Sequence, residues 1–161
     1  MNGLRKVLVV DDDVLVGKSF SRVLTEDKGY RVITSHNAAE ALQKLHEQEV
    51  DLVFTSIKMP GMDGLELAGQ VKARWPQTSV VIISSDGTTA NETRAKAAGV
   101  SAFIHKPLSP ELIEESAVQA LRQSGQPMAA AIAAIAPEPE PAQKESRIKN
   151  ILLFLIAPFG A

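Results

Sequence analysis

The chain has 161 residues, which is enough for one ordinary domain with its own core and an extension. Its 17 lysines and arginines nearly balance its 19 acidic residues, and the net charge of -2 predicts no basic surface for direct nucleic-acid binding. It contains no cysteine, which excludes disulfides, thiolate metal sites and cysteine nucleophiles and fits a reducing compartment.

The first part of the chain predicts three strand and helix pairs. Residues 7–10 form a short β-branched run, typical of a strand buried on both faces. This run is too short for a signal peptide, so we expect the protein in the cytoplasm. In chain order, the predicted elements are a strand at 7–10, a helix at 14–28 closed by Gly29, a strand at 30–34, a helix from Asn37 to about Glu49, a strand at 52–57 and a helix at 65–74.

The second part continues the same alternation up to about residue 122. The predicted elements are a strand at 80–84, an alanine-rich and weakly anchored helix at 89–98, a strand at 102–105 and a helix that starts at Ser109-Pro110. Five strands alternating with five helices predict an α/β fold. Its parallel sheet would be doubly wound, with helices on both faces.

The composition changes at residue 123. Residues 123–147 are rich in alanine, proline and glutamate and predict a linker. Residues 148–161 form an apolar tail whose longest run is too short to cross a bilayer, since a spanning helix needs about 20 apolar residues. Three interpretations stay open: a tail that docks on a partner or tethers the domain to the inner face of a membrane, the stub of a longer transmembrane helix, or a segment folded back on the domain.

Polar side chains stand at the predicted carboxyl ends of four strands. They are Asp11 and Asp12 after the first strand, Ser56 after the third, Ser84 after the fourth and Lys106 after the fifth. In a parallel sheet these ends meet at one edge, where ligands bind. Two carboxylates on one turn suit Mg2+, and a lysine with a serine hydroxyl can hold phosphoryl oxygens.

The motifs VLVVDDD, DLVFTSIKMPGMDG, VVIISS and FIHKP together resemble the receiver domains of two-component response regulators, over about residues 4–122. The resemblance implies a CheY-like, flavodoxin-like (βα)5 sheet with strand order 2-1-3-4-5 and a C-terminal extension. It also implies roles for the site residues: Mg2+ ligands at Asp11, Asp12 and the backbone carbonyl of Lys58, a hydroxyl sensor at Ser84, the pocket lysine at Lys106 and an aromatic switch at Phe103.

Ser56 departs from the family pattern, because receivers carry at this position the aspartate that takes a phosphoryl group from a histidine kinase. A carboxylate is ionised at neutral pH, whereas a serine hydroxyl must lose its proton to a base. We therefore expect a phosphorylation-independent receiver with weakened Mg2+ binding, in which Lys106 pairs with Asp11 or Asp12. The alternative is a receiver phosphorylated at Ser56, Thr55 or another pocket residue such as Asp12.

The sequence indicates a signalling module rather than an enzyme. No general base stands beside Ser56 and no nucleophile-elbow motif is present, which argues against a serine hydrolase. The resemblance implies partners such as a histidine kinase, another response regulator or an output protein. It also implies that the last two α/β units offer the surface for a homodimer.

Overall fold

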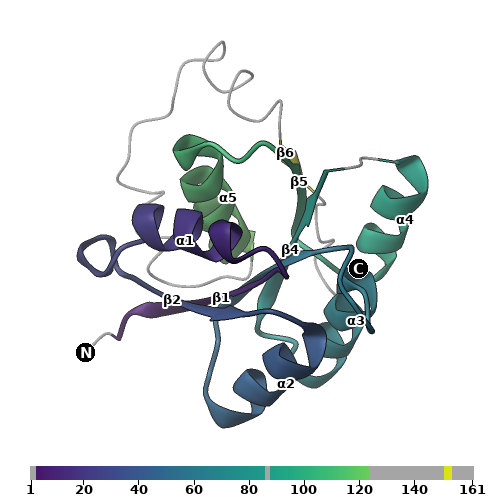
Figure 1. Cartoon of the computed structure of the whole chain (residues 1–161), viewed down its shortest axis with the longest axis horizontal. Coiled ribbons are helices and arrows are strands. Elements are labelled where there is room, and N and C mark those ends of the chain that lie inside the picture. The colour runs from purple at the N-terminus through teal and green to yellow at the C-terminus, as the bar shows by residue number, and fades with distance from the viewer. Residues whose placement is uncertain (1–2, 86–87, 124–150, 154–161) are drawn as a thin grey trace.

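The computed structural model describes residues 3–85, 88–123 and 151–153, which form one layered α/β unit (Figure 1). Its elements are β1 (Arg5–Val10), α1 (Val14–Val23), the 3-10 turn η1 (Glu26–Lys28), β2 (Tyr30–Ser35), α2 (Ala38–Glu47), β3 (Leu52–Ser56), α3 (Gly64–Arg74), β4 (Ser79–Ser84), α4 (Thr89–Ala97), β5 (Ala102–His105), α5 (Pro110–Gln123) and β6 (Ile151–Leu153).

The sheet has the order β2-β1-β3-β4-β5-β6. Its first five strands are parallel, so the predicted flavodoxin-like order 2-1-3-4-5 is confirmed. The register sets Val9 beside Phe54 and Phe54 beside Val81 across the middle of the sheet. The carboxyl ends of β1, β3, β4 and β5 therefore lie along one edge, as the site requires.

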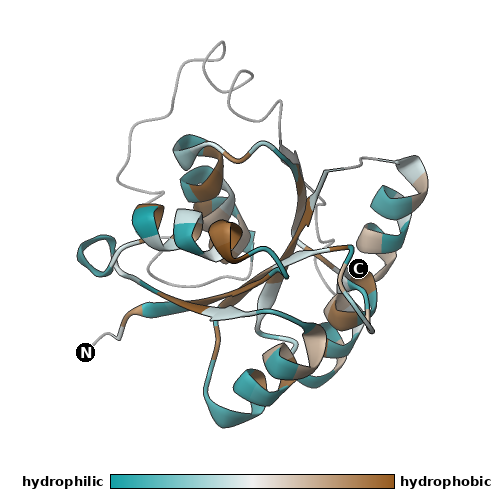
Figure 2. Cartoon of the chain, in the orientation of Figure 1, coloured by the Kyte–Doolittle hydropathy of each residue, from teal (hydrophilic) through white to brown (hydrophobic). Residues whose placement is uncertain are grey.

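Helices cover both faces of the sheet, α1 and α5 on one and α2, α3 and α4 on the other (Figure 1). Alternating residues of β1 divide between two apolar clusters: Val9 packs with α1 and α5, and Leu8 packs with α2 and α3. Figure 2 shows the apolar sides of the helices turned toward the sheet. The β-branched runs are thus buried on both faces, as the sequence predicted.

The structure corrects the prediction for one helix and confirms that for another. The predicted helix over 14–28 is wrong at its end, because α1 stops at Val23 and a separate 3-10 turn follows. Thr25 is extended, and Gly29, with φ of 95°, reverses the chain into β2. Ala95 is the buried residue of α4, which confirms the weak apolar anchoring predicted for that helix.

The C-terminal segment contributes one further strand. Ile151–Leu153 (β6) pairs with β5 in antiparallel orientation, so this part of the tail folds back on the domain. The rest of the predicted tail over 148–161 and the predicted linker, from residue 124 onward, lie outside the described residues. In the described part of the chain, no helix has the length and apolarity needed to cross a membrane.

Candidate functional site

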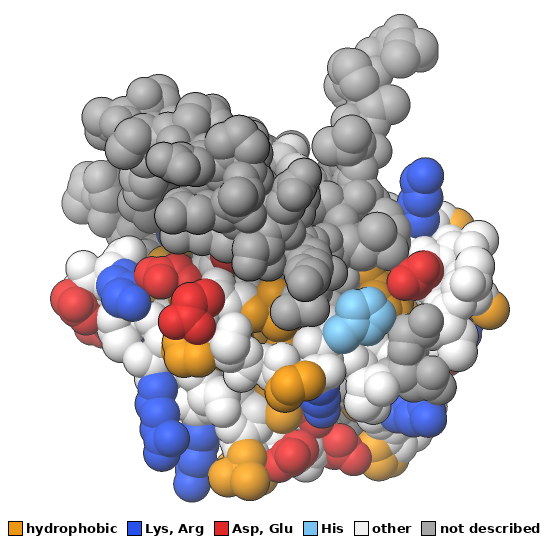
Figure 3. All heavy atoms as spheres, turned by 90° about the horizontal axis from the view of Figure 1, so that it is seen from above, with side chains coloured by type: hydrophobic (Ala, Val, Ile, Leu, Met, Phe, Trp, Pro, Cys, Tyr) orange, Lys and Arg blue, Asp and Glu red, His pale blue; other side chains and the backbone are white. Residues whose placement is uncertain are grey.

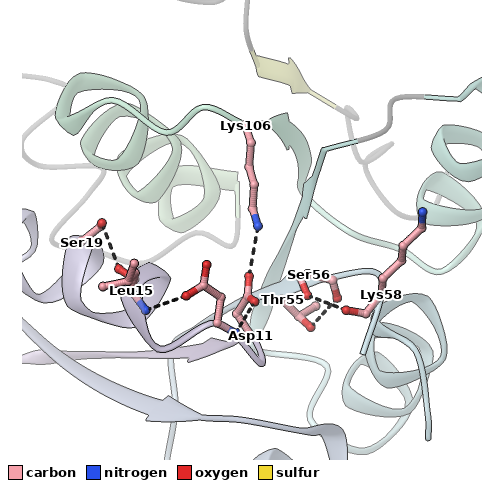
Figure 4. A network of polar contacts seen from close by, with 8 residues as sticks. Asp11, Leu15, Ser19, Thr55, Ser56, Lys58 and Lys106 are labelled. Carbon is pink, nitrogen blue, oxygen red and sulfur yellow. Dashed lines mark hydrogen bonds and ion pairs between the residues drawn. The ribbon is translucent and has the colours of Figure 1, made fainter. Parts of the chain in front are cut away.

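A small cavity of about 70 Å³ opens where β1, β3 and β4 end. It gathers side chains or backbone from every predicted pocket position: Asp11, Asp12, Ser56, Lys58, Ser84 and Lys106. The loop after β4 and the first turn of α4 complete its wall with Ser85 and Asn91. The strand ends therefore converge as predicted, and Figure 4 shows four of the residues that meet there: Asp11, Ser56, Lys58 and Lys106.

Asp11 and Lys106 form an ion pair across the site. Lys106 Nζ lies 3.5 Å from Asp11 Oδ2, which agrees with the pairing predicted from the sequence (Figure 4). Asp11 is only 4% exposed, and its Oδ1 accepts the backbone N–H of Asp13 at 2.9 Å. Burial, helped by the neighbouring Asp12 side chain, raises the pKa of the Asp11 carboxyl above its ordinary value of 3.8, against the lowering effect of the Asp13 N–H and of Lys106.

Ser56 lies at the end of β3 with its hydroxyl engaged in a local contact. The residue is 7% exposed, and its Oγ donates to the backbone carbonyl of Lys58 at 3.4 Å (Figure 4). That carbonyl is the one that the family resemblance implies as a metal ligand. The neighbouring Thr55 is fully buried, and its Oγ1 donates to the Ser56 carbonyl at 2.9 Å. The hydroxyl at the acceptor position thus points its proton at a carbonyl oxygen rather than at a base.

His105 does not serve Ser56 as a base. Its Nε2 lies 4.0 Å from Glu92 Oε2 of α4, and its ring lies 5.3 Å from that of Phe103. The imidazole therefore faces α4, on the opposite side of β5 from Lys106, as strand alternation predicted. Phe103 is fully buried in the cluster that packs under α2, α3 and α4, and it does not line the cavity.

The sequence reasoning missed Asn91, which reaches the cavity from α4. The backbone N–H of Asn91 donates to Thr88 Oγ1, which caps the helix. A threonine before an alanine-rich helix was the available signal, because an N-cap places the third residue after it in the first turn. Position 91 is thereby brought beside the strand ends.

The oxygen donors of the cavity suit a hard cation, but two of them already have competing contacts. Asp11 pairs with Lys106 and the Lys58 carbonyl accepts from Ser56. No cluster of three or more histidine, aspartate or glutamate side chains with metal-site geometry occurs in the described residues. Asp11, Asp12 and the Lys58 carbonyl would hold Mg2+, which the carboxylates would help to neutralise.

Restoring a carboxylate at position 56 is expected to tighten Mg2+ binding. Ser56→Asp adds a negative ligand and removes the hydroxyl that donates to the Lys58 carbonyl, so the Kd for Mg2+ should fall about tenfold. Isothermal titration of the full-length wild type and variant measures the change. Ser56→Asn is the matched control, because it has the same shape without the charge; equal affinities for the two variants would contradict the expectation.

Comparisons with known proteins agree with this geometry. Residues 7–118 match the family described as the response regulator receiver domain. The chain is 33% identical over 118 residues to the transcriptional regulatory protein GlrR of Escherichia coli, covering 73% of this chain but only 26% of GlrR.

Solved structures of receiver domains also match this chain. A CheY-like receiver domain protein from Methanospirillum hungatei superposes with a TM-score of 0.72 at 28% identity, covering 77% of this chain and 98% of that one. The beryllofluoride-activated NtrC4 receiver domain, described as a dimer, gives a TM-score of 0.69 at 28% identity, covering 74% and 98% of the two chains. The parallel sheet, the cavity at its carboxyl edge and these matches place the chain in the response regulator receiver domain family.

Proposed function

We propose that this receiver domain is a phosphorylation-independent signalling module that acts through protein contacts. The observation that carries the proposal is Ser56 at the acceptor position, with its hydroxyl donating to the Lys58 carbonyl at 3.4 Å. A serine oxygen becomes a nucleophile for phosphorus only when a base removes its proton. In the contact made by Ser56, the proton stays on Oγ and is directed at a carbonyl oxygen, which is too weak a base to remove it.

The charges around Ser56 also oppose its activation. Lys106, which lines the same cavity, is paired with Asp11 rather than directed at the serine. Asp11 uses Oδ1 to accept the Asp13 N–H, so it too is occupied. The cavity therefore stabilises an uncharged serine, and the site's own ion pair replaces the contact that a phosphoryl group would make with the lysine.

Burial disfavours the alternative in which a Ser/Thr kinase modifies this strand. Ser56 is 7% exposed and Thr55 is fully buried in the middle strand of the sheet. To reach Thr55, a kinase would have to pull β3 out of the core, which means unfolding the domain. Ser56 is reached only through the cavity of about 70 Å³, which admits a small phosphodonor rather than the active site of a protein kinase. Asp12, which is exposed, is the remaining pocket carboxylate that an outside phosphodonor can reach.

The contacts through which the module acts are proposed to be those of receivers, with kinases, other regulators or output proteins. In the described residues, the exposed large apolar side chains are Val14 and Leu15, 53% and 66% exposed, in the first turn of α1. Adjacent exposed apolar side chains favour a protein partner. On the face seen in Figure 3, the described charges of both signs are interspersed, which does not suit a nucleic-acid surface.

Incubation of the full chain with Mg2+ and acetyl phosphate, followed by intact mass, tests the proposal. Wild type is expected to stay unmodified, whereas Ser56→Asp is expected to gain one acid-labile phosphoryl group, because only the acceptor is missing. Ser56→Ala is the control for loss of the hydroxyl and should also stay unmodified. An acid-labile adduct on wild type that disappears in Asp12→Asn would overturn the proposal in favour of Asp12 as acceptor.

A further inference from the structure

The outer edge of β5 is covered by a strand from the far end of the chain. Ile151, Leu152 and Leu153 of β6 lie opposite Ile104, Phe103 and Ala102 in antiparallel orientation. Figure 1 shows β6 beside β5. Every other strand pair in the described sheet is parallel. β6 is therefore an addition to the five parallel strands of the receiver sheet, and with β6 in place β5 is no longer the edge strand.

Without β6, β5 would be an edge strand with little to discourage pairing by another chain. Ala102, Phe103 and Ile104 are fully buried and apolar. The opposite edge differs: β2 carries the exposed Arg31, whose Nε lies 3.1 Å from Glu26 Oε2. Charged side chains on an edge strand discourage pairing, whereas the uncharged stretch of β5 from Ala102 to Ile104 would offer its backbone N–H and C=O groups as a template.

The connection between α5 and β6 favours pairing within one chain. Residues 124–150, 27 in number, separate the two elements. A tether of this order gives its ends an effective concentration of about a millimolar. At micromolar protein concentrations, β6 therefore pairs with its own β5 far more often than any segment of a second molecule does.

We propose that β6 is a cap that keeps the β5 edge of one molecule from pairing with a second copy of the chain. When β6 leaves, the free edges of two copies pair about a two-fold axis, since β5 presents the same groups to its symmetry mate. The cap is independent of what occupies position 56. It gives the tail a role in setting the oligomeric state of the domain.

Paired proline substitutions in the full chain test the cap. Backbone N–H groups point alternately to the two sides of a strand, so one of residues 152 and 153 donates toward β5. Leu152→Pro combined with Leu153→Pro therefore removes that donor, whichever of the two residues supplies it. Leu155→Pro combined with Ile156→Pro is the matched control, with the same apolar loss and the same prolines beyond the three residues of β6. The β6 variant is expected to dimerise at least tenfold more tightly than wild type and the control in sedimentation equilibrium.

Two further measurements separate the cap from misfolding and from other partners. Hydrogen exchange should show faster exchange at alternate amides of β5 in the dilute variant, with the β1 and β3 amides unchanged. A peptide of residues 146–156 should return the variant to monomer, and the same peptide with prolines at 152 and 153 should not. Unchanged β5 exchange, a variant that stays monomeric, or a variant that instead binds anionic vesicles would each overturn the proposal.

Discussion

Replacing Gly64 with alanine is expected to lower the free energy of unfolding by about 3 kcal/mol or more. A Cβ atom built on Gly64 falls 1.8 Å from the backbone oxygen of Ser56 and 2.8 Å from its carbonyl carbon. These are backbone atoms of the central strand and have no rotamer by which to move aside. The Gly64 N–H also donates to the Ile57 carbonyl at 2.8 Å, so α3 starts in direct contact with the end of β3.

Urea denaturation of the full chain, followed by circular dichroism, measures this loss. The matched control is Gly69→Ala in the same helix, where an added Cβ meets no heavy atom within 4 Å. That substitution should raise the free energy of unfolding by about 0.5–1 kcal/mol, because alanine restricts the unfolded chain and favours the helix. Equal effects of the two substitutions would mean that α3 can move away from Ser56, and the close approach would lose its structural importance.

Much of the fold could be predicted because the sequence patterns that mark its helices and strands are local. Asn37 caps α2 by accepting the Glu40 N–H, and Ser109 accepts the Leu112 N–H at the start of α5. Buried strands read as β-branched runs, and their alternation with helices fixes a parallel sheet. The edge that collects Asp11, Ser56 and Lys106 follows from that topology alone.

The features that could not be predicted depend on contacts between distant or competing groups. The pairing of Ile151–Leu153 with β5 joins segments about 50 residues apart, and its apolar sequence suits a membrane or a partner equally well. The contact of Ser56 with the Lys58 carbonyl depends on a rotamer, which composition does not specify. The end of α1 at Val23 depends on the extended Thr25, which starts the 3-10 turn η1, and on Gly29, which reverses the chain into β2, rather than on helix propensity.

Replacing Asp11 with asparagine is expected to stabilise the domain at pH 7, by about 1.4 kcal/mol for each unit by which folding raises the pKa of Asp11. The introduced amide would keep an Oδ1 that accepts the Asp13 N–H, while the substitution removes a buried charge. In the part of the chain that the structure describes, Asp11 Oδ2 accepts no hydrogen bond, and its attraction to Lys106 acts over 3.5 Å. Desolvation is the largest influence on the pKa of Asp11 and raises it. The free-energy penalty of burying the ionised carboxylate is therefore larger than the stabilisation it gains from the Asp13 N–H and Lys106.

The advantage of Asp11→Asn should depend on pH. Below the unfolded-state pKa of 3.8, Asp11 is protonated in both states and the cost of its charge vanishes. As pH rises from 3.8 through the raised folded-state pKa, the unfolded chain ionises first, so wild type loses stability relative to the variant. The difference between the two should be fully developed above that folded-state pKa, measured in urea with EDTA present.

Asp27→Asn is a control for which the opposite change in stability with pH is expected. Its side-chain hydrogen bond with Thr25 lowers the pKa of Asp27, so the ionised form favours the folded state above pH 3.8. Removing that charge should reduce stability at neutral pH and leave it unchanged in acid. If both variants responded to pH in the same direction, the effect at Asp11 would reflect net charge rather than burial.

A stabilising Asp11→Asn would mean that the site retains a carboxylate that destabilises the fold, and natural proteins keep such residues where they bind a partner or a cation.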